Sequence, residues 1–508
     1  MQELHTPSQA AEWLRARMTG RLCSDSRQVR AGDAFMAWPG AAHDARAHVA
    51  GVLAEGAAAC LVELEGAQAY AWPADRVASY RQLKAASGEI AAACYGQPSE
   101  GLAVLAVTGT NGKTSSAWWL AQALSNLKLE KPIPCGLVGT LGIGQVPDAG
   151  QSATLVSTGL TTPDPVRLQQ AFRQFVDQGL QACAIEASSI GLAEHRLDGT
   201  RIHTALFTNF TQDHLDYHGS MDAYWQAKRA LFDWPGLKAA AVNLDDPQGL
   251  ELAQHLQGRD LALWTFSCRD PAPASARLRA LDVRYAEAGL LFTVAEGDER
   301  QVLQTRLLGS FNVSNLLGVL ATLRSLGVSL AAAVQACAAL APVPGRMECR
   351  SAPGHPLVVV DYAHTPDALA KALAALVPLA RARGGELCCV FGCGGDRDRA
   401  KRPLMAAQAE ALADRLVLTS DNPRSEPPQS ILDQMAQGLQ ARIPVTQEPD
   451  RARAIAGAIA QARAQDVMLV AGKGHEDYQE VAGARLPFSD LEQVAQALAR
   501  APLLEVAA

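Results

Sequence analysis

The chain has 508 residues, of which 48% are hydrophobic, and its mean hydropathy is close to zero. That composition is typical of a soluble globular protein, and a chain of this length is expected to divide into about two to four domains of roughly 150 residues each. Its 45 Lys and Arg against 52 Asp and Glu give a net charge of −7 without any basic block, which excludes the broad cationic surface that nucleic acid requires.

The sequence shows no targeting or membrane segment. Residues 1–20 lack the apolar core of a signal peptide, and no stretch reaches the roughly 18 uninterrupted apolar residues of a membrane span. We therefore expect a cytoplasmic protein that contacts neither membrane nor nucleic acid. The 11 cysteines have no metal-type spacing, so buried reduced thiols are expected rather than disulfides or a zinc site.

The N-terminal part is the least regular. Two short apolar runs, GDAFMAWPG (32–40) and AACLVELEG (58–66), predict strands of a small mixed α/β domain. Proline-containing breaks at 95–101 and 340–348 then separate the rest of the chain into two larger parts. We predict three domains, comprising residues 1–98, 99–341 and 342–508.

The middle part opens with an apolar strand that runs into a glycine-rich loop, LAVLAVTGTNGKT (102–114). The usual phosphate-binding pattern is G-x-x-x-x-G-K-[ST], but Val107 stands where its first glycine belongs. Glycines at a strand-to-helix turn still let backbone N–H groups face a phosphate. We therefore favour a nucleotide loop, in which Lys113 neutralises phosphate charge and Thr114 reaches Mg²⁺, over a simple helix-capping turn.

Further apolar runs at 181–189, 203–214 and 239–247 predict a mostly parallel sheet in this middle part. Glu186, His214 and Lys228 are its candidates to serve a cation. An ammonium is not a metal ligand, so the residues alone favour a surface lysine at Lys228. They likewise favour a helix-capping or hydrogen-bonded core histidine at His214.

The last part is the most regular. Four apolar runs, at 356–365, 386–396, 415–424 and 466–476, alternate with alanine-rich helical stretches, which indicates a parallel α/β sheet with right-handed crossovers. Each run ends in a polar cluster, and ligands bind outside the carboxyl ends of such strands. Arginines that suit carboxylates lie beside acids that suit ammonium groups, so we prefer a zwitterion site to surface salt bridges.

Eleven short strings in chain order carry a family resemblance: SDSR (24–27), TGTNGKT (108–114), TTPDP (161–165), EASS (186–189), DHLDYHG (213–219), FNVSN (311–315), PGRME (344–348), DYAHTPDAL (361–369), GCGGDRDRAKRPLM (392–405), DNPR (421–424) and GKGHEDYQ (472–479). Together they resemble the Mur ligase family, most closely its member that adds the third amino acid. The match covers nearly the whole chain.

The resemblance implies a UDP-binding N-terminal domain, a central P-loop ATPase domain and a C-terminal Rossmann-like domain that binds the amino acid. It implies an ADP-forming ligase of peptidoglycan precursor synthesis, in which ATP phosphorylates the D-glutamate γ-carboxylate of UDP-MurNAc-L-Ala-D-Glu. The amine of meso-diaminopimelate then attacks the acyl phosphate. These three small molecules and Mg²⁺ are the expected ligands, and a monomer is the expected state.

The resemblance also assigns residues. The residues that it assigns to ATP binding are Gly109, Thr110, Asn111, Gly112, Lys113, Thr114, Asn312, Arg346 and Asp361. The residues that it assigns to Mg²⁺ are Thr114, Glu186, His214 and Lys228, the last as N6-carboxylysine. The catalytic residues that it implies are Lys113, Glu186, His214 and Lys228. The UDP-MurNAc-dipeptide falls to Ser24, Ser26, His43, Asp44, Ala45, Thr161, Thr162, Ser188, Glu194 and Arg196. Diaminopimelate falls to Arg397, Asp421, Asn422, Pro423, Arg424, Gly472 and Glu476.

Some positions depart from the family pattern. Relatives often carry His and Gln where this chain has Ile190 and Glu194, and His-Gln-Ala is more usual than the His-Asp-Ala found at 43–45. Glu194 beside an anionic sugar peptide is the most unusual of these.

Three alternative functions remain. One is ligation of L-lysine to the same nucleotide, which Arg424 argues against because it suits the distal carboxylate that lysine lacks. Another is addition of glutamate to folate, which DNPR and GKGHEDYQ argue against. The third, of a different class, is a P-loop nucleotide-binding regulatory or motor protein, which leaves the zwitterion cluster unexplained.

Overall fold

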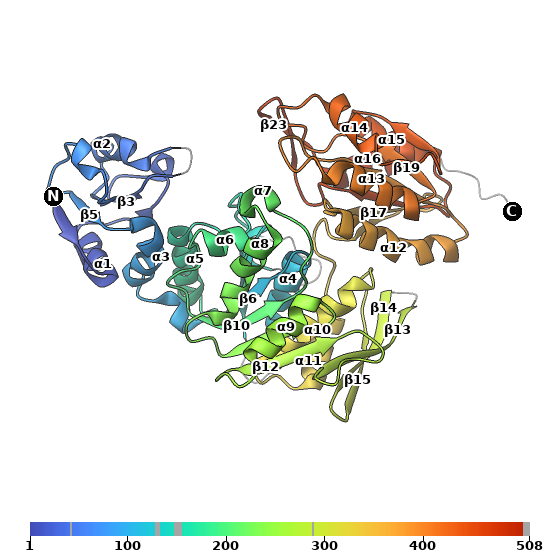
Figure 1. Ribbon diagram of the computed structural model, residues 1–508, viewed down its shortest axis with the longest axis horizontal. Helices are drawn as coiled ribbons and strands as arrows, with labels where there is room; N and C mark the ends of the chain where they lie inside the picture. The colour runs from blue at the N-terminus through green and yellow to red at the C-terminus, as the bar shows by residue number, and fades with distance from the viewer. Residues whose placement is uncertain (41–42, 128–132, 147–154, 287–288, 501–508) are drawn as a thin grey trace.

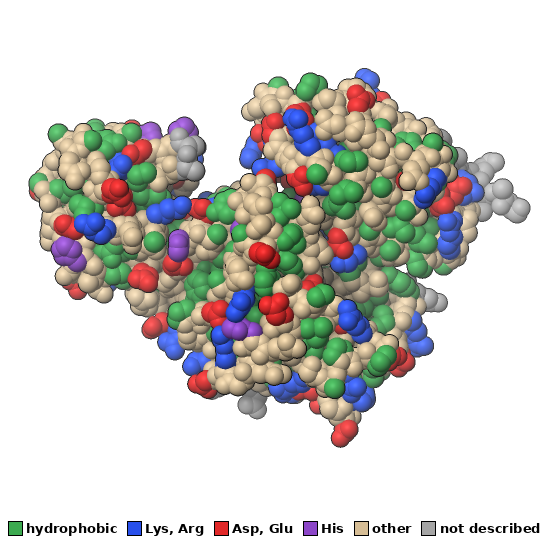
Figure 2. All heavy atoms as spheres, viewed as in Figure 1, with side chains coloured by type: hydrophobic (Ala, Val, Ile, Leu, Met, Phe, Trp, Pro, Cys, Tyr) green, Lys and Arg blue, Asp and Glu red, His purple; other side chains and the backbone are tan. Residues whose placement is uncertain are grey.

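The computed structural model describes residues 1–500 except 41–42, 128–132, 147–154 and 287–288. Figure 1 shows three lobes, with the N-terminal part on the left, the C-terminal part at the upper right and the middle part below them. Figure 2 shows an open hollow between the N-terminal and C-terminal lobes, above the middle one. The expected three-part α/β fold is confirmed, whereas the domain limits stay predictions.

The N-terminal sheet is five-stranded and entirely parallel, in the order β1-β5-β4-β3-β2. Its strands are β1 (Gln2–Leu4), β2 (Leu22–Cys23), β3 (Ala34–Ala37), β4 (Ala59–Glu63) and β5 (Val77–Tyr80), with helices α1 (Pro7–Arg15), α2 (Val49–Ala54) and α3 (Leu83–Cys94). The two strands predicted here are β3 and β4. Helix α3 lies close against the middle part, since a Cβ on Gly88 would be 2.1 Å from the carbonyl oxygen of Asp198.

The central sheet has ten strands in the order β15-β14-β13-β12-β11-β10-β6-β9-β7-β8. They are β6 (Ala103–Thr108), β7 (Cys135–Gly139), β8 (Gly142–Gln145), β9 (Ala182–Glu186), β10 (Ile202–Phe207), β11 (Ala239–Asn243), β12 (Ala262–Ser267), β13 (Leu278–Ala286), β14 (Gly289–Glu296) and β15 (Glu299–Gln304). The strands from β7 to β13 in this order pair in parallel, and β8, β14 and β15 are joined antiparallel at the two edges.

Helices cover both faces of this sheet, which is why its inner strands are continuously apolar. Along β6, Leu105 and Val107 pack with α4 (Lys113–Ser125), α10 (Phe311–Ser325) and α11 (Leu330–Ala338). Val104 and Ala106 point the other way, as alternate residues of a strand do, toward the face that carries α5 (Pro165–Asp177) and α9 (Pro247–Leu256). The short helices α6 (Ser189–Ala193), α7 (Leu215–His218) and α8 (Met221–Arg229) lie beyond the strand ends.

The C-terminal sheet has the order β16-β17-β21-β18-β19-β20, parallel except for β16. Its strands are β16 (Glu348–Arg350), β17 (Leu357–Asp361), β18 (Leu387–Phe391), β19 (Arg415–Leu418), β20 (Val445–Gln447) and β21 (Val467–Ala471), and β22 (Tyr478–Val481) with β23 (Ala484–Pro487) forms a separate hairpin. Helices α12 (Pro366–Ala382), α13 (Lys401–Leu412) and α14 (Pro428–Ala436) pack on one face, and α15 (Arg451–Gln461) and α16 (Asp490–Arg500) on the other. All four strands predicted in this part are present.

All 11 cysteines lie in the described part of the chain, where they are unpaired, nine of them buried and two half-buried. This agrees with the expected thiols. Among the described residues, no helix is both long and apolar enough to cross a lipid bilayer.

Candidate active site

The glycine-rich loop joins β6 to α4, and its glycines are sterically required. Gly109 (φ +145°) and Gly112 (φ +84°) have left-handed backbones, and a Cβ on Gly109 would lie 1.9 Å from the hydroxyl of Thr208. The backbone N–H of Asn111 donates to Asn209 Oδ1 at 2.9 Å, which fixes the loop against the end of β10. The shortened spacing therefore produces a compact strand-to-helix turn with α4 beginning at Lys113.

Two lysines converge on one carbonyl of this loop. Lys113 Nζ donates to Gly109 O and to Thr110 O, both at 2.9 Å, and Lys228 Nζ donates to Gly109 O at 2.8 Å. Lys228 is only 1% exposed, so the interpretation of it as a surface lysine is wrong. It shares the inward face of α8 with Tyr224, four residues earlier. Burial, with the nearby charge of Lys113, lowers the pKa of the Lys228 ammonium well below its ordinary value and favours the neutral amine.

Glu186 ends β9 as a buried carboxylate held by hydroxyl and backbone donors. Thr114 Oγ1 donates to its Oε2 at 2.8 Å, and Thr140 donates to Oε1 through its backbone N–H at 2.7 Å. Thr140 Oγ1 is a further donor at 3.3 Å. Sequence reasoning missed Thr140, because the β7–β8 turn that carries it has no recognisable motif.

His214 occupies the residue before α7 with a left-handed backbone (φ +52°) and makes no side-chain capping bond. The helix-capping interpretation is therefore wrong. Its ring centroid lies 6.0 Å from that of Tyr224, and Lys228 Nζ lies 4.5 Å from the same centroid, so two of the four predicted Mg²⁺ residues adjoin one aromatic ring. Burial lowers the pKa of His214, which leaves a neutral imidazole able to bind a metal.

The donor set suits Mg²⁺ in part as it stands. Thr114 and Glu186 present oxygen atoms 2.8 Å apart, which are the hard ligands that Mg²⁺ prefers. No cluster of three or more His, Cys, Asp or Glu side chains of metal-binding type occurs among the described residues. An oxygen ligand from Lys228 would require that its amine first be modified.

A cavity of about 570 Å³ lies over the glycine-rich loop. It is lined by the predicted ATP residues Thr110 to Thr114, Asn312, Arg346 and Asp361, by Glu186 and His214, and by the predicted dipeptide residues Thr161 and Ser188. Arg346 bridges its two walls, since its Nη2 donates to Thr114 Oγ1 at 3.2 Å and its guanidinium lies 4.3 Å from the Tyr362 ring centroid. Three residues to which sequence reasoning gave no role also line it: Phe311, from the string FNVSN, and Asn243 and Asp245, from the run at 239–247.

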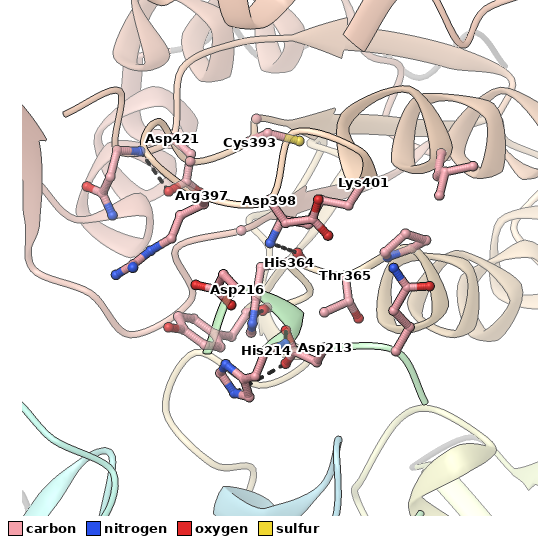
Figure 3. Close-up of a pocket in the computed structure, with 18 of the residues that line it drawn as sticks. Asp213, His214, Asp216, His364, Thr365, Cys393, Arg397, Asp398, Lys401 and Asp421 are labelled. Atoms are coloured by element: carbon pink, nitrogen blue, oxygen red, sulfur yellow. Dashed lines mark hydrogen bonds and ion pairs between the residues drawn. The ribbon is translucent and has the colours of Figure 1, made fainter. Parts of the chain in front are cut away.

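A second cavity, of about 430 Å³, lies where the four C-terminal strands end. Six of the seven predicted diaminopimelate residues line it, Pro423 being the exception: Arg397, Asp421, Asn422, Arg424, Gly472 and Glu476. Figure 3 shows Arg397, Asp398 and Lys401 of the C-terminal part above Asp213, His214 and Asp216 of the middle part. The cavity therefore lies between the two parts and carries charges of both signs.

Hydrogen bonds hold one carboxylate and one guanidinium group of this second cavity. Lys473, which is fully buried, donates to Glu476 Oε2 at 2.7 Å and to Asn422 Oδ1 at 3.1 Å. Arg424 Nη1 donates to Gly395 O at 2.7 Å, and its Nε lies 3.3 Å from Glu480 Oε2. Lys473 lies inside the string GKGHEDYQ, but sequence reasoning gave it no role.

The two cavities adjoin. Asp213, His214, Tyr362 and His364 line both of them. Burial, together with the neighbouring Lys401, lowers the pKa of His364 to about 4, so its ring is neutral at physiological pH. A group bound over the glycine-rich loop and a group bound at the four strand ends would therefore meet across these shared walls.

The remaining predicted residues lie outside both cavities or at their edge. Ser24 Oγ donates to Asp164 Oδ1 at 2.8 Å and so ties the N-terminal part to the TTPDP segment. Thr162 Oγ1 donates to Glu186 O at 2.7 Å, and Arg196 Nη1 donates to Thr162 O at 3.0 Å. Ser26, His43, Asp44 and Ala45 belong to the N-terminal part and line neither cavity.

The negative charge of Glu194, the most unusual departure from the family pattern, is balanced by neighbouring side chains. Lys84 Nζ of α3 lies 2.5 Å from its Oε2, and the hydroxyl of Tyr217 donates to its Oε1. These two contacts, that of Lys84 first, lower the pKa of the Glu194 carboxyl, so the side chain is ionised. The acid therefore does not present an unpaired negative charge.

Comparison with known proteins agrees with this architecture. A family model described as "Mur ligase middle domain" matches residues 107–323, and one described as "Mur ligase, glutamate ligase domain" matches residues 345–474. A protein of Acidovorax sp. (strain JS42) named "UDP-N-acetylmuramoyl-L-alanyl-D-glutamate--2,6-diaminopimelate ligase" is 62% identical over 507 residues, 98% of this chain and 99% of the relative. A Pseudomonas aeruginosa protein of the same name is 47% identical over 94% of both chains.

Solved structures give the same result. A structure of a UDP-N-acetylmuramoyl-L-alanyl-D-glutamate--2,6-diaminopimelate ligase aligns over 94% of both chains with a TM-score of 0.63 and 34% identity. MurF ligase from Thermotoga maritima, solved in complex with ADP, aligns over 96% of this chain and 97% of its own with a TM-score of 0.64. At 19% identity, the second shows a shared fold alone.

Proposed function

The chain belongs to the Mur ligase family, and we propose that it joins meso-2,6-diaminopimelate to UDP-N-acetylmuramoyl-L-alanyl-D-glutamate while it converts ATP to ADP and phosphate. It would then be an ADP-forming ligase of peptidoglycan precursor synthesis, acting as a cytoplasmic monomer. The names of the relatives support this substrate pair.

The observation that carries the proposal is the shared wall between the two cavities. Peptide ligation needs an activated carboxyl and a free amine within reach of each other while water is kept away. The cavity over the glycine-rich loop suits the nucleotide, and the cavity at the four strand ends suits a small zwitterion. Their common lining, which includes Asp213 and His364, supports a carboxyl activated in one being attacked from the other.

The chemistry proceeds in two displacements. A γ-carboxylate oxygen of D-glutamate attacks the terminal phosphorus of ATP, the bond from that phosphorus to the bridging oxygen breaks, and ADP leaves. The amine of diaminopimelate then attacks the acyl carbon, phosphate leaves with the former carboxylate oxygen, and the nitrogen loses a proton. Both partners of the first step are anionic, so a cation at Lys113 offsets their repulsion in the transition state.

We assign Mg²⁺ to Thr114, Glu186, His214 and a carboxylated Lys228. The ion would supply positive charge that offsets the negative charge on the phosphates. The depressed pKa of Lys228 supports its modification, because the neutral amine is the form that combines with CO₂ to give a carbamate. The carbamate would provide the oxygen ligand that the unmodified side chain lacks.

In the second cavity, Asp421 and Glu476 suit the ammonium groups of diaminopimelate, and Arg424 and Arg397 suit its carboxylates. Arg424 would select against lysine, because lysine lacks the distal carboxylate that could accept from the guanidinium N–H groups not already directed at Gly395 O and Glu480. We assign the remaining ATP contacts to Asn312, Arg346 and Asp361 and the dipeptide contacts to Thr161, Thr162, Ser188, Glu194 and Arg196. The UDP end is assigned to Ser24, Ser26 and residues 43–45.

The decisive experiment measures ligation by the purified protein supplied with UDP-MurNAc-L-Ala-D-Glu and ATP. Each reaction contains either meso-diaminopimelate or L-lysine, and products are identified by mass. We expect an adduct and stoichiometric ADP with diaminopimelate. Better ligation of lysine would overturn the substrate assignment, and ATP hydrolysis without any adduct would favour a nucleotide-driven regulatory protein instead.

A further inference from the structure

A fully buried ion pair lies behind the second cavity and takes no part in the chemistry described above. The side chains of Arg451 and Asp490 are both 0% exposed. Arg451 Nε and Nη2 donate to the two carboxylate oxygens of Asp490, each at 2.7 Å, which is the bidentate geometry of a strong guanidinium–carboxylate pair. Neither residue lines either cavity.

The rest of the Arg451 fork holds two strand ends together. Its Nη1 donates to Ser420 O at 3.1 Å, and its Nη2 donates to Ala471 O at 2.9 Å. These carbonyls directly precede Asp421 and Gly472, two residues of the amino-acid cavity. Strands β19 and β21 are not neighbours in the sheet, since β18 lies between them, so no ladder hydrogen bond fixes the distance between their ends.

The spacing that Arg451 sets is a narrow one. A Cβ on Gly472 would lie 2.4 Å from Asp421 Oδ2, so the backbone at Gly472 and the carboxylate of Asp421 are almost in contact. Asp421 and Glu476 also act on Arg451. Burial alone would lower the pKa of its guanidinium, but Asp490 and these two carboxylates outweigh that effect and raise it. The buried cation is thus electrostatically linked to both acids assigned to the ammonium groups.

Stability alone does not explain such a pair. Removing two charges from water is costly, and well-packed apolar residues of similar volume often stabilise a core as well or better. Arg451 donates four hydrogen bonds to one carboxylate and two carbonyls, and because its guanidinium is planar and rigid, these bonds fix the positions of the three groups relative to one another.

We propose that Arg451 and Asp490 are positioning residues for the incoming amino acid. They hold the ends of β19 and β21 at the separation in which Asp421 and Gly472 form one binding surface. Arg451 is the first residue of α15 and Asp490 the first of α16, so the pair also anchors the last described helix beneath the site. The C-terminal helix α16 is then a functional part of the amino-acid site.

The test compares an apolar replacement with a matched control. The double variant Arg451→Met, Asp490→Leu removes both charges and so leaves neither one buried without its partner. The control is Arg415→Met at the opposite end of β19, where Arg415 pairs with Glu386 and Asp466 away from both cavities. KM values for ATP, for the nucleotide dipeptide and for diaminopimelate are measured together with Tm.

We expect the double variant to keep the Tm of the wild type within a few degrees and to raise KM for diaminopimelate at least about tenfold, with the other two KM values within about twofold. The control leaves all three KM values unchanged. Should the double variant fail to fold, Arg451→Lys keeps the charge pair but loses the fork, and it is expected to show the same selective rise.

The inference rests on the proposed function, and different experimental results would overturn each of the two. Wild-type protein that ligates no diaminopimelate would overturn both. An active wild type with an unchanged diaminopimelate KM in the folded variant would overturn the positioning role alone. An equal rise in all three KM values, or the same rise in Arg415→Met, would show a merely structural pair and would overturn it as well.

Discussion

Replacing Arg424 with alanine is expected to remove most of the discrimination between diaminopimelate and lysine. The Arg424 side chain is 21% exposed at the cavity wall, so a carboxylate bound to it would be largely shielded from solvent. A hydrogen bond to a charged group contributes about 1.5 to 3 kcal/mol, which corresponds to a factor of about 10 to 150. We expect kcat/KM for diaminopimelate to fall by that factor, while the low value for lysine stays constant or rises.

The assay is a competition in which both amino acids are present in one reaction and the two adducts are counted by mass. Their ratio gives the ratio of kcat/KM values and is independent of the fraction of active enzyme. Arg424→Lys serves as a comparison because it keeps the charge but loses the planar fork. Both variants lose the planar fork and its bond from Nη1 to Gly395 O, so a decrease common to both reports on that geometry, and a difference between them reports on the charge. A diaminopimelate-to-lysine ratio unchanged in Arg424→Ala would refute the assignment.

Three further variants test other parts of the site. Lys228→Ala should lose activity and partly recover when short carboxylic acids are added, because these can replace the carbamate oxygen. Full activity of the variant without added acid would refute the carboxylation of Lys228. Lys113→Ala should abolish ATP turnover, measured as ADP release, and retained turnover would move the nucleotide site elsewhere. Lys84→Met should raise KM for the nucleotide dipeptide about three- to tenfold by exposing the charge of Glu194. Adding Glu194→Gln should restore it, whereas an equal defect in the double variant would show that the charge is irrelevant.

Much of the fold could be predicted because its inner strands are buried on both faces. The runs at 356–365 and 466–476 contain continuous apolar stretches, LVVV (357–360) and VMLVA (467–471), for that reason, and these stretches form inner strands of the C-terminal sheet. The hairpin β22–β23 and the strands β13 to β15 escaped prediction. Their residues are partly exposed and mixed in polarity, and their pairing depends on neighbours rather than on local pattern.

The candidate site, like the fold, could be predicted from the sequence only in part. The glycine-rich loop is contiguous, so its residues could be recognised together from the amino-acid sequence. Lys228 was misjudged from its own sequence context, since its burial against Tyr224 and the carbonyl of Gly109 depends on a segment more than a hundred residues earlier. Thr140 and Arg451 carried no signal at all, because each acts through contacts that only the packing of distant elements creates.

The specificity loop DNPR is itself held by an element outside its motif. Arg424 has a left-handed backbone (φ +51°), and its N–H donates to Glu480 O while its own carbonyl accepts from the N–H of Ala482. The side chain of Gln479 donates to Asp421 O at 2.7 Å, and the N–H of Glu480 donates to Asn422 Oδ1 at 2.9 Å. The loop thus gains its shape from the hairpin β22–β23, whose outer strand is exposed and free of the constraints of a core. Since Glu480 also lies 3.3 Å from the Arg424 guanidinium, a change in that hairpin can alter amino-acid selection while the DNPR string remains intact.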